Sequence, residues 1–220
     1  MNFDQHLSRR TALILGLTTA TAALASTPAL AQAVPDPIDT IDMDALLSEN
    51  ALPEIVQGSE DAPVTIVEYA SMTCGFCARF HTQTYPTIKE KYIDTGQVRF
   101  VSREFPLDPR AAAAFMLARC APNDSYFAMI DVLYKQQNAW ARAENARAPL
   151  ENIAKLAGFT QESFEACLTD QKLLDDVNKV RVRASEEFGV RSTPTFFING
   201  DMYSGALTVD QMSAIIDSKL

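Results

Sequence analysis

The sequence predicts an α/β protein with a central mixed sheet, whose two sheet-forming halves are separated by a helical insertion. Between residues 62 and 105, a strand pattern, a helical pattern and a second strand pattern follow one another. After residue 190, two short strand patterns joined by a tight-turn sequence precede a last helical pattern. Residues 107–189, which lie between these halves, show helical patterns only. A crossover helix joins parallel strands and a tight turn joins antiparallel ones, so both kinds of pairing are expected.

The first 33 residues have the layout of a cleavable export signal. Arg9 and Arg10 precede an apolar run, and the steps Ala29–Ala31 and Ala31–Ala33 offer small-residue cleavage sites. A membrane anchor is the alternative, but a spanning helix needs roughly 20 strongly apolar residues, and threonines interrupt this run. The string SRRTALI resembles a twin-arginine signal, and the general secretion route stays open. We therefore expect export, with cleavage near residues 31–33.

The charge and length of the exported chain limit the classes of function and the number of domains that are possible. Without its first 33 residues, the chain carries 17 basic and 27 acidic side chains, a net charge of −10. It contains no run of Lys or Arg that could form the positive patch required for nucleic-acid binding. The remaining length suffices for one domain with a sizeable core, or for a domain with a large insertion. Residues 34–50, polar and punctuated by proline, are interpreted as an N-terminal lead-in with one short helical pattern.

Residues 62–105 predict a βαβ unit that carries a Cys-x-x-Cys motif. The stretch APVTIVEYAS, residues 62–71, is β-branched and apolar, as expected of a buried strand. A helical pattern runs from Cys74 to about residue 92, and the stretch QVRFVSREF, residues 97–105, alternates like a second strand. Strands connected in this way run parallel. Cys74 and Cys77 therefore lie in the first helical turn after a strand.

This position favours redox chemistry for the cysteine pair. The thiolate is the reactive form of cysteine, and a helix N-terminus presents unpaired N–H groups and the positive end of the helix dipole. Cys74 should therefore ionise readily, since cysteines in such settings have pKa values of roughly 3.5 to 7.5. A disulfide whose reduced form is stabilised as a thiolate accepts electrons readily. Cys77, one turn deeper, is the expected resolving thiol that attacks a mixed disulfide.

The C-terminal segment predicts a ββα unit. The string PTFFI is a strand pattern, Asn199–Gly200 is a strong hairpin-turn signal, and MYSG can pair back. An amphipathic helix is expected over residues 209–219. A βαβ half followed by a ββα half is the arrangement of the thioredoxin fold.

The motifs VEYASMTCGFC and STPTFFING, with the helical stretch between them, resemble the thioredoxin-fold disulfide oxidoreductases of the DsbA type, in particular their alphaproteobacterial branch. This resemblance implies a thioredoxin-like domain made of residues 51–106 and 190–220, with residues 107–189 as an inserted all-helical domain. It implies a periplasmic enzyme that introduces disulfides into reduced or unfolded exported proteins through its CGFC motif, without a cofactor or metal. It also implies reoxidation by a membrane quinone-linked partner of the DsbB type. We expect a monomer, because no dimerisation domain is visible.

The resemblance assigns substrate-binding roles beside the cysteine pair. Pro194 should be cis and lie next to the two sulfurs, although an ordinary strand-start proline is the alternative. Thr193 should offer backbone hydrogen bonds to an extended substrate segment. Gly75 and Phe76, which lie between the cysteines, are expected to contact substrate.

The resemblance also places a buried acid under the cysteine pair, at Glu68. In the stretch TIVEYAS this residue interrupts an otherwise apolar run. A buried carboxylic acid tends to stay neutral near pH 7, so Glu68 could pass a proton to or from Cys77. An exposed position at a sheet edge is the alternative. His81, four residues beyond Cys77, is interpreted as a packed or surface helix residue and not as a participant.

The dipeptide between the cysteines leaves the direction of electron flow open. Many DsbA-type enzymes carry a histidine there, whereas this chain has Gly75 and Phe76, so one source of thiolate stabilisation is missing. A Cys-Gly-aromatic-Cys motif, with Thr193 before the proline, also resembles the disulfide isomerases. An isomerase or reductase kept reduced by a membrane donor therefore stays an alternative. So does a non-enzymatic metal carrier or holdase.

Cys120 and Cys167 each lie at the end of a predicted helix in the insertion. In an exported protein they are expected to form a second, structural disulfide, as in the helical domain of the DsbA-type branch. Two buried free thiols and, less favourably, a zinc site stay open. The predicted helices are DPRAAAAFMLARC with its start at Asp108, NDSYFAMIDVLYKQQ capped at Asn123 or Asp124, APLENIAKLAG, TQESFEACL capped at Thr160, and Asp170 to about Phe188.

Overall fold

A mixed six-stranded sheet forms the centre of the structure, a computed structural model that describes residues 34–220. The order across the sheet is β1-β6-β5-β3-β4-β2. Strands β3 and β4 pair in parallel, and the other neighbouring strands pair antiparallel. The strands are β1 (Asp39–Thr40), β2 (Ile55–Gln57), β3 (Val64–Ala70), β4 (Val98–Glu104), β5 (Thr195–Ile198) and β6 (Asp201–Ser204). The predicted export signal, residues 1–33, lies outside the described residues.

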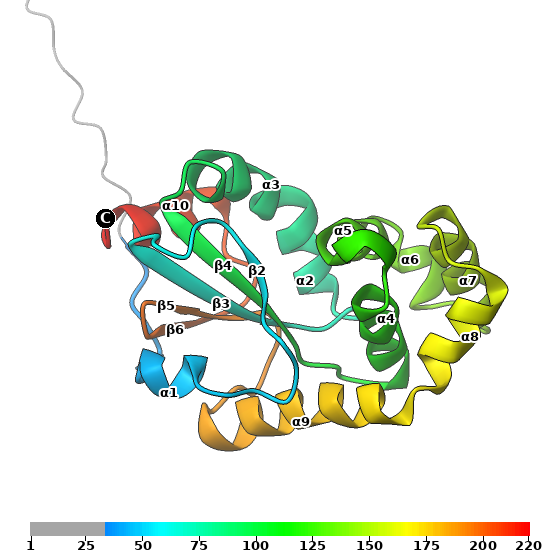
Figure 1. Ribbon diagram of the computed structural model, residues 1–220. Coiled ribbons are helices and arrows are strands. Elements are labelled where there is room, and N and C mark those ends of the chain that lie inside the picture. Colours follow the sequence, from blue (N-terminus) through cyan, green and yellow to red (C-terminus); the bar gives the residue numbers. More distant parts are fainter. Residues whose placement is uncertain (1–33) are drawn as a thin grey trace, which may run out of the picture. The chain divides into compact units, whose positions relative to one another are not determined.

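Helices cover both faces of the sheet (Figure 1). Helices α3 (Tyr85–Ile88) and α10 (Val209–Asp217) lie on one face, and α1 (Met43–Leu47) and α9 (Gln171–Glu187) lie on the other. Helix α2 (Gly75–Arg79) continues into α3 through π-helical turns, so one helical segment follows β3, as predicted. In the part of the chain that the structure describes, no helix combines the length and apolar character needed to cross a membrane.

Two apolar clusters hold these layers together. Side chains alternate along a strand, so Ile66 and Phe100 point to the cluster under α3 and α10, whereas Val67 and Val101 point to the cluster on the other face. Because both faces of the central strands are covered, β3 and β4 are apolar on both sides. Complete burial of an aliphatic or aromatic side chain stabilises the fold by about 1.5–3 kcal/mol. The predicted βαβ and ββα halves are confirmed.

The hairpin predicted at Asn199–Gly200 joins β5 to β6. Both turn residues have positive φ, 48° and 95°, as a type I′ turn requires. A side chain at Gly200 would place its Cβ 2.6 Å from the carbonyl oxygen of Ile41, so this position needs glycine for space as well as for conformation. The structure also contains two short edge strands that were not predicted, β1 beside β6 and β2 beside β4.

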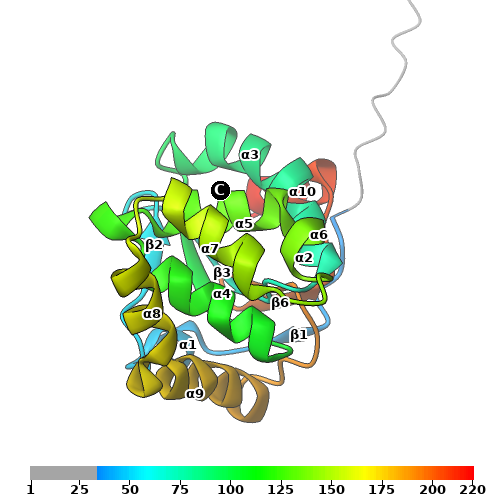
Figure 2. The same cartoon turned by 90° about the vertical axis from the view of Figure 1, so that its right-hand side faces the viewer.

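The segment between β4 and β5 is helical, and most of its helices lie beyond the carboxyl ends of β3 and β4 (Figures 1 and 2). Asp108, Thr160 and Asp170 cap their helices with side-chain hydrogen bonds to backbone N–H groups. The cap at Thr160 and the helix starts at Asp108 and Asp170 were predicted. In addition to α9, these helices are α4 (Pro109–Arg119), α5 (Tyr126–Lys135), α6 (Gln137–Trp140), α7 (Arg147–Leu156) and α8 (Gln161–Thr169).

The prediction that Asn123 or Asp124 caps the second of these helices was wrong. Both residues belong to a short 3-10 turn and have positive φ, 56° and 54°, a conformation that does not continue into a right-handed helix. Helix α5 begins after Ser125 instead, and no side-chain hydrogen bond caps it. Sequence spacing alone could not separate the turn from the helix, because both favour Asn and Asp.

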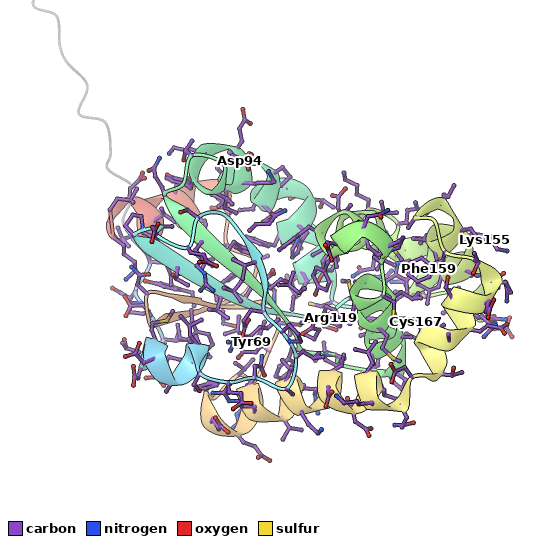
Figure 3. All side chains as sticks on the ribbon, in the orientation of Figure 1. Tyr69, Asp94, Arg119, Lys155, Phe159 and Cys167 are labelled. Atoms are coloured by element: carbon purple, nitrogen blue, oxygen red, sulfur yellow. A yellow bond between two sulfur atoms is a disulfide. The ribbon has the colours of Figure 1, made fainter. Side chains whose placement is uncertain are left out.

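A disulfide joins Cys120, at the end of α4, to Cys167 in α8 (Figure 3). The two Cα atoms lie 6.2 Å apart, and the bond closes a separation of 47 residues. Cys167 is buried against the carbonyl oxygen of Met116, 3.1 Å from its sulfur. The disulfide therefore lies inside the helical segment, on helices that are separate from the Cys-x-x-Cys turn.

Candidate active site

Cys74 occupies the N-cap position of α2. Its backbone is extended, with φ −78° and ψ 121°, and its N–H donates to the carbonyl oxygen of Ser71 at 3.1 Å. This turn carries the chain from the end of β3 into the helix. Cys74 is partly exposed and Cys77 is completely buried, and both are free thiols in the structure. Cys74 is therefore the sulfur that another protein can reach.

The surroundings of Cys74 favour its thiolate form. Together they lower the pKa of Cys74 from 9.0 to about 5, and a hydrogen bond from the Cys77 thiol is the largest single influence. Hydrogen bonds from the Thr193 side chain and from the backbone N–H groups of Phe76 and Cys77 act in the same direction, whereas partial burial opposes them. Near neutral pH, Cys74 is therefore largely ionised.

The surroundings of Cys77 have the opposite effect. Burial raises the pKa of Cys77 well above its usual range, and the hydrogen bond to Cys74 and the negative charge of Glu68 raise it further. The N–H of Ser71 donates to its sulfur at 3.4 Å and only partly offsets these effects. Near neutral pH, Cys77 therefore stays a protonated thiol, and it must lose its proton before it can attack a disulfide.

A loop from the other half of the fold lies against Cys74. Strand β5 pairs with β3, with Thr195 opposite Tyr69, and this register places the preceding loop beside the cysteine pair. The Thr193–Pro194 peptide bond is cis, and the Cys74 thiol donates to the carbonyl oxygen of Thr193 at 3.2 Å. Within residues 34–220, the buried Thr193 hydroxyl has no hydrogen-bond partner while Cys74 is a thiol. It is therefore available to donate to the Cys74 thiolate.

The dipeptide between the two cysteines faces outward. A Cβ built on Gly75 would meet no atom within 4 Å. The Phe76 side chain is 55% exposed, and the Arg79 guanidinium lies 5.1 Å from the centre of its ring. An exposed aromatic ring beside a reactive sulfur gives this part of the surface a contact area for another chain.

Glu68 lies inside the protein and not at an exposed edge. Its side chain is fully buried on β3, and its Oε2 atom is hydrogen-bonded to Nε2 of His81, 2.8 Å away. His81 is itself buried, 3% exposed. The second carboxyl oxygen of Glu68, Oε1, accepts no hydrogen bond from any described residue. His81 is packed, as the sequence allowed, but its pairing with Glu68 was not predicted.

Two side chains of the helical segment bind the turn that precedes α2. The side-chain amide of Gln137, in α6, donates to the carbonyl oxygens of Met72 at 2.8 Å and Cys74 at 2.9 Å. The hydroxyl of Thr73 donates to the carboxylate of Asp108 at 2.5 Å. Neither contact was predicted, because a single Gln in a helical pattern carries no sequence signal for a distant carbonyl group. Across residues 34–220, no three or more His, Cys, Asp or Glu side chains are grouped to hold a metal ion.

Comparisons with known proteins match this geometry. A family model described as thioredoxin matches residues 50–218. A Rickettsia bellii protein, provisionally named a protein-disulfide oxidoreductase, is 32% identical over 186 residues, which are 83% of this chain and 70% of that protein. The crystal structure of Wolbachia pipientis alpha-DsbA1 matches with a TM-score of 0.73 at 32% identity, over 80% of this chain and 94% of that one. BdbD from Bacillus subtilis, with a TM-score of 0.69 at 20% identity and coverage of 84% and 98%, shares the fold.

The sheet order and the thiol pair at the start of α2 define a thioredoxin-fold thiol:disulfide oxidoreductase. Within that class, the chain belongs to the DsbA-type protein-disulfide oxidoreductases. The family and the enzyme class predicted from the two motifs are thus confirmed.

Proposed function

We propose that this protein is an exported oxidant that introduces disulfides into reduced proteins in the periplasm. The observation that carries the proposal is the contrast between the two thiols: the pKa of Cys74 is lowered to about 5, and the pKa of Cys77 is raised. Closing the disulfide consumes the stabilised Cys74 thiolate. Stabilising that thiolate therefore destabilises the disulfide relative to the reduced form and makes it a better electron acceptor.

The reaction proceeds by two thiol–disulfide exchanges. A substrate thiolate attacks the sulfur of Cys74 in the closed disulfide, the Cys74–Cys77 bond breaks, and Cys77 leaves and takes up a proton. A second substrate thiolate then attacks the substrate sulfur of the mixed disulfide and releases Cys74 as a thiolate. The substrate cysteines lose two electrons and the enzyme gains them. The greater exposure of Cys74 makes it the sulfur that is attacked.

Glu68 exchanges the proton of Cys77 in this scheme. Cys77 leaves as a thiolate in a buried site, where its charged form is disfavoured by burial and by the negative charge of Glu68. A proton passed from Glu68 to Cys77 moves the negative charge from the sulfur to the carboxyl group, so the two neighbouring groups are not charged at the same time. When the reduced enzyme is reoxidised, Glu68 takes the proton back, and the Cys77 thiolate attacks the mixed disulfide on Cys74.

Substrate binds over the loop at Thr193–Pro194 and over the exposed dipeptide. The carbonyl oxygen of Thr193 accepts a hydrogen bond from Cys74 only while Cys74 is a thiol. Once Cys74 is a thiolate, that oxygen is free to accept from the backbone N–H of an extended substrate segment. The open space at Gly75 allows the substrate to approach, and Phe76 offers an apolar contact.

The partners follow from this chemistry. The substrates are reduced or unfolded exported proteins, and a membrane quinone-linked protein of the DsbB type removes the electrons. The protein acts as a monomer.

The proposal also divides the chain into parts with separate roles. Residues 1–33 direct export. Residues 51–106 and 190–220 form the thioredoxin-like domain, and residues 107–189 form the inserted helical domain.

The resting redox state of the pair in cells tests the direction of electron flow. A thiol-alkylating reagent added to intact cells should leave Cys74 and Cys77 unmodified, because an oxidant is kept closed by its partner. An isomerase or reductase, the alternative favoured by Gly75, Phe76 and Thr193, would have both thiols alkylated. The Cys74→Ser/Cys77→Ser variant serves as the control for alkylation at other sites. A mainly reduced pair in wild-type cells would contradict the proposal.

A further inference from the structure

The proton of Cys77 has to be exchanged within a small buried group of side chains. Cys77, Glu68 and His81 are each buried. Two tyrosines adjoin them, Tyr85 from α3 and Tyr134 from α5, and burial raises the pKa of both hydroxyls above their usual range, with the charge of Glu68 acting in the same direction. Both tyrosines therefore stay neutral. Neither hydroxyl is therefore expected to give up its proton to Glu68 near neutral pH.

The surrounding rings fix the orientation of His81. Its imidazole is stacked on Tyr134, with the ring centres 4.4 Å apart and the planes 16° apart. Tyr85 lies 5.2 Å away and Phe80 5.4 Å away, both measured between ring centres. In this position Nε2 points at Oε2 of Glu68, at 2.8 Å. The packing of these rings therefore holds the hydrogen bond between Glu68 and His81 in place within the core.

The two oxygens of Glu68 have different roles. Oε2 is bound to His81, whereas Oε1 is buried without a hydrogen-bond donor among the described residues. A buried charge without a partner is strongly disfavoured, and a hydrogen bond to the charged form favours it. With its proton on Nε2, His81 provides the donor that Oε2 needs in this buried site, while Oε1 stays open to receive a proton.

We infer that His81 is a positioning residue for the proton exchange of Cys77 and that Glu68 and His81 hold the exchanged proton together. When Cys77 ionises, its proton passes to Glu68, and the pair of Glu68 and His81 gains one proton. When Cys77 leaves the disulfide as a thiolate, the same proton returns to it. The inference rests on the proton role proposed for Glu68, and it adds a partner without which that carboxylate would be buried alone.

Imidazole suits this position because it can both donate to the carboxylate and accept a proton near neutral pH. A side-chain amide of similar reach can donate the same hydrogen bond but cannot take up a proton near neutral pH. His81→Gln therefore retains a hydrogen bond to Glu68 but removes the second proton site. This difference separates a proton-sharing role from a role in packing.

The test measures how fast Cys77 releases glutathione from a mixed disulfide on Cys74, as a function of pH. We expect His81→Gln to lower this rate about tenfold near neutral pH and to move the profile up by about one pH unit, which is the shift that corresponds to a tenfold change. In a Glu68→Gln background, His81→Gln should have little further effect, since the two residues act as one unit. Tyr134→Phe is the matched control, because it keeps the stacked ring and should leave the profile unchanged.

A second measurement uses the folded wild-type chain. The sequence contains only two histidines, His6 and His81. His6 lies in the predicted export signal, so ¹⁵N-histidine labelling gives the His81 signals alone in the cleaved chain, and a His6→Gln variant assigns them in the uncleaved one. The His81 signals should differ between the oxidised and reduced enzyme at the same pH, because the proton count of the pair changes. Identical His81 signals in the oxidised and reduced enzyme would overturn the inference about His81. So would a pH profile of glutathione release that changes in Glu68→Gln but not in His81→Gln. Both outcomes would leave the proposed role of Glu68 intact. An unchanged profile in Glu68→Gln would overturn the proposed role of Glu68 as well.

Discussion

The side-chain amide of Gln137 lies 2.9 Å from the carbonyl oxygen of Cys74 and so connects the helical segment directly to the reactive cysteine. The same nitrogen donates to the carbonyl oxygen of Met72 at 2.8 Å. Gln137 thus holds the turn between β3 and α2 through a side chain of the helical segment, in addition to the backbone hydrogen bonds at the start of α2. The reactivity of Cys74 depends on hydrogen bonds whose geometry this turn sets.

Replacing Gln137 with alanine should weaken both stability and reactivity. The carbonyl oxygen of Met72 loses its donor, whereas that of Cys74 keeps the N–H of Ala78 at 3.1 Å. An unsatisfied buried polar group costs about 1–3 kcal/mol of unfolding free energy. The loosened turn should also raise the pKa of Cys74, as measured by thiolate absorbance during a pH titration. Gln136→Ala is the control, because Gln136 is exposed and makes no side-chain hydrogen bond in the structure. Equal effects of the two variants would show that the amide does not position the turn.

The difference in exposure between the two cysteines predicts which one forms the covalent intermediate. Cys77→Ser should accumulate mixed disulfides with substrate proteins on Cys74, because the resolving thiol is missing. Cys74→Ser should abolish oxidation of dithiol substrates, since Cys77 is buried. Non-reducing electrophoresis and peptide mapping identify the linked sulfur. An adduct mapped to Cys77 would show that the assignment is reversed.

The lowered pKa of Cys74 predicts a pH-dependent stability of the reduced enzyme. Its pKa is about 5 in the folded reduced form, against a usual value of 9.0. This contribution to stability is fully present above about pH 9 and is lost as the pH falls through about 5. With allowance for solvent screening of a partly exposed sulfur, it is about 1–2 kcal/mol at pH 7.

The contribution of the Cys74 thiolate can be measured by comparing the guanidinium unfolding of the reduced and oxidised forms. The oxidised form has no Cys74 thiol to titrate, so groups such as Asp201 contribute to both forms and cancel in the difference. The advantage of the reduced form should shrink steadily from pH 9 to pH 5. The Cys74→Ala variant cannot form the disulfide, and it should show no such slope when it is compared with the oxidised wild-type enzyme. A difference that stays constant in the wild-type enzyme would mean that Cys74 is not ionised near neutral pH.

The sequence predicted those features that depend on local patterns. The strand and helix order of both halves follows from apolar periodicity, and the turn at Asn199–Gly200 follows from the backbone conformation that these residues favour. The position of Cys74 follows from the change of period between β3 and α2. The helix start at Asp108 and the cap at Thr160 follow from the hydrogen-bonding capacity of their side chains.

The features that were missed depend on contacts between distant segments. Glu68 and His81 are 13 residues apart and meet because the helix after β3 packs back across that strand. Gln137 reaches Met72 across 65 residues. Neither residue type has a pattern that indicates its partner. The edge strands β1 and β2 are too short to show alternation, so they could be recognised only from their pairing with β6 and β4.

The disulfide between Cys120 and Cys167 should stabilise the protein without taking part in catalysis. Closing a loop of 47 residues is worth about 4 kcal/mol of unfolding free energy on the chain-entropy model. Replacing both cysteines with alanine should lower the unfolding free energy by up to this amount, while Cys74 remains the residue that forms mixed disulfides. Thermal unfolding and adduct mapping check the two parts separately. Loss of all turnover in a folded double variant would show that this pair relays electrons.

The redox potential of the cysteine pair should lie between the potentials of DsbA and thioredoxin. Cys74 gains from hydrogen bonds to Cys77, Thr193 and the first turn of α2, but Phe76 stands where an imidazole would add a cation. DsbA has a potential near −120 mV and thioredoxin one near −270 mV. We expect a value between these two, measured by equilibration with glutathione buffers. A potential at or below that of thioredoxin would contradict the oxidant role and favour the reductase alternative.

Phe76 offers a direct way to shift this potential. Phe76→His places an ionisable ring in the first turn of α2, beside Cys74, and its protonated form should lower the pKa of Cys74 and raise the potential. Each 1.4 kcal/mol of added thiolate stabilisation corresponds to about 30 mV. The effect should grow as the pH falls and the imidazole becomes charged, although Arg79, which lies 5.1 Å from the present ring, opposes that charge. Phe76→Tyr is the control, because it keeps an aromatic ring against Arg79 without adding a cation. If Phe76→His and Phe76→Tyr have the same potential at every pH, the dipeptide does not set the redox properties of Cys74.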